Sequence, residues 1–96
     1  MTKGTMPYPK GDLRRMLSVL SAIDSPAGAT VAQVSTVTGL SRQTVTDLIQ
    51  GAAQQAGVRI RKSGSVYQIV DWGPVIRKSG AALALTGELE GSEVEE

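Results

Sequence analysis

The sequence predicts a small α+β domain, with three helices, a β-hairpin and disordered tails. Apolar residues recur at helical spacing in three stretches before residue 57 and alternate with basic residues just after it. The chain has only three aromatic residues and no Phe, so its core must consist mainly of Val, Leu, Ile, Met and Ala. A length of 96 residues allows one domain and makes a two-domain enzyme improbable.

The first helix is expected at residues 13–24, with Asp12 as its N-cap. Residues 1–11, which precede it, mix prolines and glycines with polar residues and are expected to form a flexible N-terminal arm. The apolar side of the helix is predicted from residues at helical spacing: Leu13, Met16, Leu17, Leu20 and Ile23.

The second helix is predicted at residues 31–38, after a turn at residues 25–28 and a very short strand at residues 29–30. Thr30 and Gln33 have the spacing of a capping box, which marks a helix start. One side of this helix is expected to carry the β-branched residues Val31, Val34 and Val37.

A third helix is predicted at residues 42–56. Gly39 is expected to end the preceding helix in a left-handed conformation, Leu40 to be buried beneath the turn, and Ser41 to cap the new helix. Gly57 is its expected end. The buried side should contain Val45, Leu48, Ile49, Ala52 and Ala56, which leaves a polar face on the other side.

A basic hairpin follows, with strands at residues 58–61 and 66–70. With Ser63 and Gly64 as the central turn residues, the apolar side chains of the two strands share one face. In that register the facing pairs are Lys62 with Ser65, Ile60 with Tyr67 and Val58 with Ile69, and the residues facing water or a ligand are Arg59, Arg61 and Gln68.

Residues 73–86 form a C-terminal extension in which the pattern weakens; a strand followed by a small helix and a loosely docked segment both remain open. Its apolar run at residues 81–85 either packs over the domain or supplies a homodimer contact. Residues 87–96 contain five Glu and are expected to be an acidic disordered tail. The pentapeptide at residues 60–64 recurs at residues 76–80, but a repeat this short predicts no repeated structure.

Charge is divided sharply along the chain, although the net charge is only +1. Residues 1–78 hold all ten Lys and Arg against four Asp, a net charge of +6, whereas residues 79–96 hold five Glu and no cation, a net charge of −5. A basic body of this kind favours a polyanionic partner, with nucleic acid first.

The composition also excludes several classes of function. Without Cys or His the chain can form no disulfide framework, zinc finger or Ser-His-Asp system, and it contains no GxxxxGK[ST] phosphate-binding loop. We therefore expect no enzyme, no catalytic residues, no cofactor and no metal. No apolar run reaches the roughly 20 residues that span a bilayer, and no signal segment is present, so a cytoplasmic location is expected.

The predicted order over residues 12–72 is helix, helix, turn, helix, strand, turn, strand. The chain resembles here the winged helix-turn-helix DNA-binding family, and most of all the N-terminal domain of IclR-type and related bacterial regulators. The segment VAQVSTVTGLSRQTVTDLI at residues 31–49 carries the strongest resemblance. Ser35 stands where the family often has Ala, and the effector-binding domain that follows the wing in IclR-type regulators is absent, so ligand sensing is not implied.

The resemblance implies a sequence-specific protein for double-stranded DNA, a small bacterial or phage transcriptional regulator whose third helix enters the major groove. Arg42 would then read guanine and Gln43 or Gln50 adenine, while Asp47 would accept from cytosine or orient Arg42. The candidate residues of this helix are Ser41, Arg42, Gln43, Thr44, Thr46, Asp47 and Gln50.

The hairpin, or wing, is expected to contact the DNA backbone or the minor groove through Arg59, Arg61, Lys62, Ser63, Gly64 and Ser65. Tyr67 and Trp72 are expected to pack in the core rather than to stack on bases. The alternative function is a protein-interaction module, which would use the same helix and wing to dock on a polymerase or another regulator.

Overall fold

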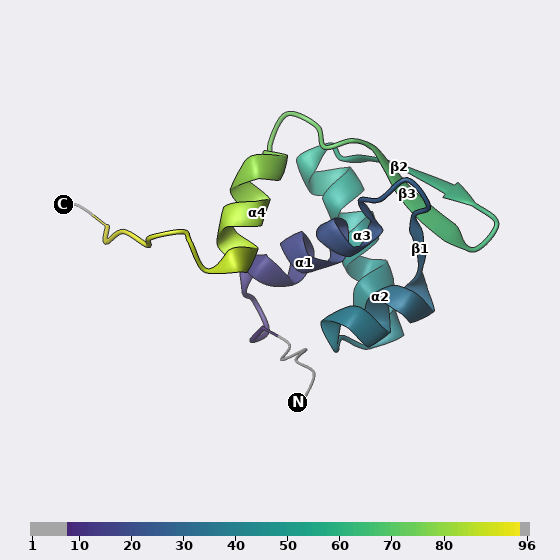
Figure 1. Cartoon of the computed structure of the whole chain (residues 1–96), viewed down its shortest axis with the longest axis horizontal. Coiled ribbons are helices and arrows are strands. Elements are labelled where there is room, and N and C mark those ends of the chain that lie inside the picture. The colour runs from purple at the N-terminus through teal and green to yellow at the C-terminus, as the bar shows by residue number, and fades with distance from the viewer. Residues whose placement is uncertain (1–7, 95–96) are drawn as a thin grey trace.

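Four α-helices and a three-stranded antiparallel sheet make up residues 8–94, the part of the chain that the computed structural model describes (Figure 1). The predicted α+β class is confirmed, but the structure has a fourth helix where three were expected. The elements in chain order are α1 (Leu13–Ile23), β1 (Ala29–Thr30), α2 (Val31–Thr38), α3 (Arg42–Ala56), β2 (Arg59–Ser63), β3 (Val66–Asp71) and α4 (Lys78–Thr86).

Helix α1 begins at Asp12, whose side chain accepts a hydrogen bond from the backbone N–H of Arg14 at 2.8 Å. The Arg14 guanidinium also donates to this carboxylate, and the two interactions lower the pKa of Asp12 to about 2. Of the predicted N-terminal arm, residues 1–7 lie outside the described residues. Tyr8 is held against α1, because its carbonyl accepts from Arg15 Nε at 2.9 Å.

Local capping fixes the bounds of α2 and α3, and both helices begin and end where the sequence predicts. Thr30 and Gln33 form the complete capping box, with each side chain accepting from the other residue's backbone N–H. Helix α2 ends at Gly39, which has a φ of 77°. Ser41 caps α3 by accepting from the backbone N–H of Thr44 at 3.1 Å.

The core lies where α1 packs against α2, α3 and the sheet, and its fully buried large side chains are Val19, Leu20, Ile23, Val34 and Val45. Of the β-branched residues expected on one side of α2, Val34 is buried but Val37 is 59% exposed, so Val37 does not join Val34 in the core. Thr38, one helical turn after Val34, takes the inward position instead. Its hydroxyl donates to the Val34 carbonyl at 2.7 Å and accepts from the backbone N–H of Leu40 at 3.3 Å, which ties the turn to α2.

Two other apolar expectations need correction. Leu13 was placed on the buried side of α1 but is 69% exposed, since it belongs to the first turn, where α1 projects beyond α2 and the sheet. Leu48 is only half-buried on α3. Leu40 is buried beneath the turn, as predicted.

The register of the hairpin differs from the predicted one. Gly64 and Ser65, rather than Ser63 and Gly64, are the central turn residues, because Ser63 pairs with Val66. Gly64 has a φ of 63°, which suits the first central position of a tight hairpin turn. The other facing pairs are Ile60 with Ile69, Arg61 with Gln68 and Lys62 with Tyr67.

This change moves the pairing by two residues, so the faces of the strands are kept and Ile60, Tyr67 and Ile69 still share one side. Val58 does not pair with Ile69 but lies before β2 and is buried in the core. Gln68 is not free to meet a ligand, because its side-chain amide donates to the Pro26 carbonyl at 2.7 Å.

Strand β3 lies in the middle of the sheet, in the order β1-β3-β2. The short strand β1 pairs with its start through Ala29 with Tyr67 and Thr30 with Val66. Since α2 begins directly after β1, this pairing brings the start of α2 beside the hairpin.

The C-terminal extension forms helix α4, which packs on α1 through the buried Ala81. Asp24, at the end of α1, accepts from Trp72 Nε1 at 3.3 Å and forms an ion pair with Lys78 Nζ at 3.2 Å. Trp72 and Tyr67 are half-buried against the core. After Gly87 the described residues 88–94 have no regular secondary structure. None of the described helices has the length and apolar character needed to cross a membrane.

Candidate nucleic-acid interface

Helix α3 presents a polar face in its first half. Val45 and Ile49 fix the helix to the core, the exposed residues Gln43, Asp47 and Gln50 lie on the opposite side, and Arg42 is exposed at the first turn. Of the seven predicted contact residues, Thr44 and Thr46 are half-buried and the other five are exposed, namely Ser41, Arg42, Gln43, Asp47 and Gln50. The structure therefore brings together on one helix the residues that the sequence assigned to the groove.

Hydrogen bonds within this face decide which groups remain available. Ser41 and Thr44 bond to each other through their hydroxyls at 2.9 Å, and the Thr46 hydroxyl donates to the Arg42 carbonyl at 3.0 Å. These hydroxyls serve mainly to hold the first turn of α3. The Arg42 guanidinium is exposed and extends from this turn.

Asp47 is bonded to Gln43, one helical turn earlier, and not to Arg42 as one prediction had it. Gln43 Nε2 donates to Asp47 Oδ1 at 2.9 Å. A carboxylate only accepts hydrogen bonds, so this contact fixes which end of the Gln43 amide faces Asp47. Within residues 8–94, the second N–H and the carbonyl oxygen of Gln43 have no other partner and can bond another group.

The hairpin carries its cations on both sides. All six predicted wing residues are exposed, although the backbones of some of them pair in the sheet: Arg59, Arg61, Lys62, Ser63, Gly64 and Ser65. Neighbouring residues of a strand point to opposite faces, so Arg61 and Lys62 lie on different faces. Lys62 Nζ is 5.5 Å from the centre of the Tyr67 ring, a cation–π contact that keeps the lysine near the sheet.

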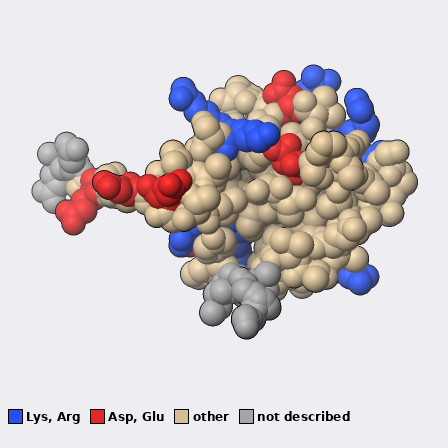
Figure 2. Space-filling model, viewed as in Figure 1, with Lys and Arg blue, Asp and Glu red and all other residues tan. Residues whose placement is uncertain are grey.

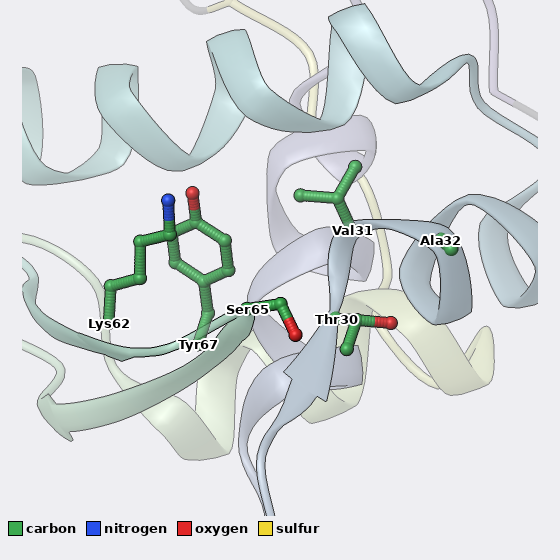
Figure 3. Close-up of a pocket in the computed structure, with 6 residues that line it drawn as sticks. All are labelled: Thr30, Val31, Ala32, Lys62, Ser65 and Tyr67. Carbon is green, nitrogen blue, oxygen red and sulfur yellow. The ribbon is translucent and has the colours of Figure 1, made fainter.

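A hollow of 390 Å³ lies between the hairpin and the start of α2, and is lined by Thr30, Val31, Ala32, Lys62, Ser65 and Tyr67. Figure 3 shows the Lys62 and Tyr67 side chains side by side with their polar ends toward the same side of the hairpin. The first backbone N–H groups of a helix lack partners within the helix. Lys62 and the first turn of α2 thus border one open space.

Sequence reasoning missed the contribution of Thr30, Val31 and Ala32 to this space. The capping box locates the start of a helix, where unpaired N–H groups favour anions, and that signal was present. What places the helix start beside Lys62 is the pairing of β1 with β3, which joins residues far apart in the sequence.

Charge on this side of the molecule is unpaired within the described residues. The ion pairs formed among residues 8–94 are Arg14 with Asp12 and Lys78 with Asp24, and neither involves α3 or the hairpin. In Figure 2 the acidic tail extends away from the body, whereas the blue side chains lie around the body itself. Among residues 8–94, no cluster of three or more acidic side chains could hold a metal ion.

Comparisons of the chain with protein-family models, characterised proteins and solved structures gave no significant match. Contact with DNA is therefore argued from the geometry and charge of α3 and the hairpin.

Proposed function

We propose that this chain is a winged helix-turn-helix module that binds double-stranded DNA with sequence preference. The observation that carries the proposal is the position of the polar face of α3, whose Arg42 forms no ion pair with any of residues 8–94, in a domain whose next element is a basic exposed hairpin. On this proposal α2, the turn at Gly39 and α3 are the helix-turn-helix, and β2 and β3 form the wing.

The size and chemistry of α3 suit the major groove. An α-helix with its side chains is about 10–12 Å across, and the groove is about 12 Å wide. Arg42 can donate two hydrogen bonds to a guanine, and the free N–H and carbonyl of Gln43 match the edge of an adenine. Base reading is therefore assigned to Arg42 and Gln43.

The wing and the start of α2 are assigned to the DNA backbone. Lys62 borders the hollow at the first turn of α2, so these elements can approach one phosphate group together. Arg59 and Arg61 add charge from the other side of the hairpin, and the small tip residues Gly64 and Ser65 allow close approach. Such contacts strengthen binding to any DNA sequence, because they release counterions from the phosphates.

By the same proposal, the protein acts as a small transcriptional regulator of the bacterial or phage type. Here the family resemblance over residues 12–72 is the support. This regulatory role requires no enzyme activity and no cofactor.

An NMR titration with a short DNA duplex at two salt concentrations tests the proposal. We expect amide shifts at residues 42–50 and 59–65, and a slope of log affinity against log salt near −4.5 if about five phosphates are contacted. Arg42→Ala should change the preferred site and Lys62→Ala should weaken all sites alike, whereas Lys10→Ala, which removes an equal charge beside α1, should do neither.

No shift at residues 42–50 and 59–65 at low salt would contradict DNA binding. A protein partner docking on the same helix and hairpin would instead give little salt dependence. The slope therefore separates the proposed function from the protein-interaction alternative.

A further inference from the structure

Exposed apolar side chains gather around α4 and the adjacent start of α1. Four large ones lie there, and Ala81 is the one buried residue of α4: Leu13 (69% exposed), Val75 (66%), Leu83 (43%) and Leu89 (58%). Two shallow hollows of 290 and 640 Å³ adjoin here and share Leu13, Leu17, Ala84 and Leu89 in their walls. We call this surface, whose margin carries the charged residues Asp12, Arg14 and Arg77, the α4 face.

The charges at the two ends of α4 are reversed relative to those that a helix favours. A helix N-terminus is partly positive and attracts acidic groups, and a C-terminus attracts basic ones. Helix α4 begins with Arg77 and Lys78, has no side-chain cap at its start, and is followed by Glu88 and Glu90. Lys78 is paired with Asp24, but among the described residues Arg77, Glu88 and Glu90 form no ion pair.

We propose that a second copy of this chain packs antiparallel to α4 on the α4 face. An antiparallel helix places its acidic C-terminal end beside Arg77 and its basic N-terminal end beside Glu88 and Glu90, so both mismatched ends are satisfied at once. Two-fold symmetry makes the two contacts identical. A parallel partner would set like charges against each other at both ends.

The outward side of α4 has the shape that this contact needs. Gly80, Leu83 and Ala84 share the side of the helix that borders the two hollows, and the two small residues allow close approach near the middle of the helix. Nine residues of helix span only about 14 Å, whereas stable dimers bury about 800 Å² on each partner. The contact must therefore include Leu13, Val75 and Leu89 beside the helix.

The arrangement leaves the candidate DNA interface free. In Figure 1, α4 lies at one end of the molecule and the β2–β3 hairpin at the other. The inference stands on the apolar surface and its charges, and it holds whether or not the protein binds DNA.

Analytical ultracentrifugation of the full chain without DNA tests the inference. We expect a concentration-dependent monomer–dimer equilibrium, and Leu83→Glu should raise the dissociation constant at least about tenfold, because each dimer contains the change twice. The control is Val37→Glu, which changes an exposed valine on α2 and should have no effect. A chain that stays monomeric at millimolar concentration, or a dimer that Leu83→Glu leaves unchanged, would overturn the inference.

Charge and cross-linking variants test the orientation, and they remain informative if Leu83→Glu fails to fold. Arg77→Glu should weaken the dimer about three- to tenfold, and adding Glu88→Lys with Glu90→Lys should restore it. The chain contains no cysteine, so single cysteines can report on neighbours. Ala84→Cys should cross-link two copies through a short linker, whereas Gly80→Cys should not, because an antiparallel pair centred near Leu83 separates residues 80 by about 9 Å along the helix axis. Efficient cross-linking at Gly80→Cys would contradict the antiparallel arrangement.

Discussion

Alanine substitutions at Gly28 and Gly64 should separate two causes of destabilisation. One is the strain of a left-handed backbone, and the other is the steric overlap of the added Cβ with its neighbours. Both residues have left-handed backbones, with φ of 69° and 63°, so alanine brings a similar conformational penalty at either position. They differ in their surroundings. A Cβ at Gly64 would meet nothing within 4 Å, whereas at Gly28 it would come within 2.6 Å of Gln68 Cγ and 2.8 Å of Val66 Cγ1, and closer still to the Tyr67 carbonyl oxygen.

The difference in stability follows from these contacts. Gly64→Ala should lower the free energy of unfolding by about 1 kcal/mol, which is the left-handed penalty less the entropy that alanine removes from the unfolded chain. Gly28→Ala must also push the turn at residues 25–28 away from β3. Overpacking of this kind costs about 1–3 kcal/mol, and loss of the hydrogen bond from Gln68 to Pro26 costs about 1 kcal/mol more. We therefore expect a total of about 3–5 kcal/mol for Gly28→Ala.

Urea unfolding followed by the fluorescence of Trp72, the single tryptophan, measures both values. Trp72 is half-buried and bonded to Asp24, so its emission should report loss of the packed domain. Circular dichroism of the same samples checks that the helices unfold in one transition. Equal destabilisation by the two substitutions would refute the close approach of the turn to β3, and with it the reason for glycine at position 28.

Three further outcomes are expected. Thr38→Val should lower the free energy of unfolding by about 1–2 kcal/mol in the same urea assay, because the buried backbone N–H of Leu40 loses its acceptor. The pKa of Asp12 is lowered from its ordinary value of 3.8 to about 2, so the ionised carboxylate stabilises the folded state above pH 4. This stabilisation is lost as the pH falls towards 2. The stability of Asp12→Asn, measured by unfolding at several pH values, should lack that part of the acid dependence. Asp47→Asn and Asp47→Ala each remove one negative charge, so both should strengthen binding to DNA of any sequence. In a competition assay, only Asp47→Ala should show a weaker preference for adenine, because it removes the acceptor that holds the Gln43 side chain.

The helix bounds were predictable because the signals that set them are local. Thr30 and Gln33 form the capping box within one turn of α2, and Ser41 caps α3 two residues after Gly39 ends α2. Each of these interactions spans at most four residues of chain. No knowledge of the tertiary fold was needed to place them.

The hairpin register was predicted wrongly, and a small helix within residues 73–86 stayed one of two open alternatives, because distant contacts decide both. Both Ser63-Gly64 and Gly64-Ser65 can occupy a two-residue turn, and the choice depends on pairing along the whole of β3. The two copies of the pentapeptide IRKSG also show that distant contacts decide the structure of a short segment. At residues 60–64 it forms β2 and the first turn residue, whereas at residues 76–80 it runs into the start of α4, which packs on α1.

In the candidate site, too, local features were predictable from the sequence and features that depend on distant contacts were not. The exposed face of α3 was predictable because helical periodicity alone separates Val45 and Ile49 from Arg42 and Gln43. The bond from Gln43 to Asp47 was within reach of sequence reasoning too, because residues four apart are neighbours on a helix, whereas Arg42 lies five residues before Asp47 and about 140° round the helix. The hollow beside Lys62 was beyond prediction, because it exists only where β1 meets β3.

The two parts of the candidate site are held by supports of unequal strength. Helix α3 is fixed by side chains that are almost fully buried, among them Val45, Ile49 and Ala52. The hairpin is joined to the rest of the domain through the two residue pairs between β1 and β3, the bond from Gln68 to Pro26, and half-buried contacts of its apolar face. Changes near β3 should therefore move the hairpin before they move α3. On the proposed function, such changes would reduce affinity for all sequences while the base preference set by α3 is kept.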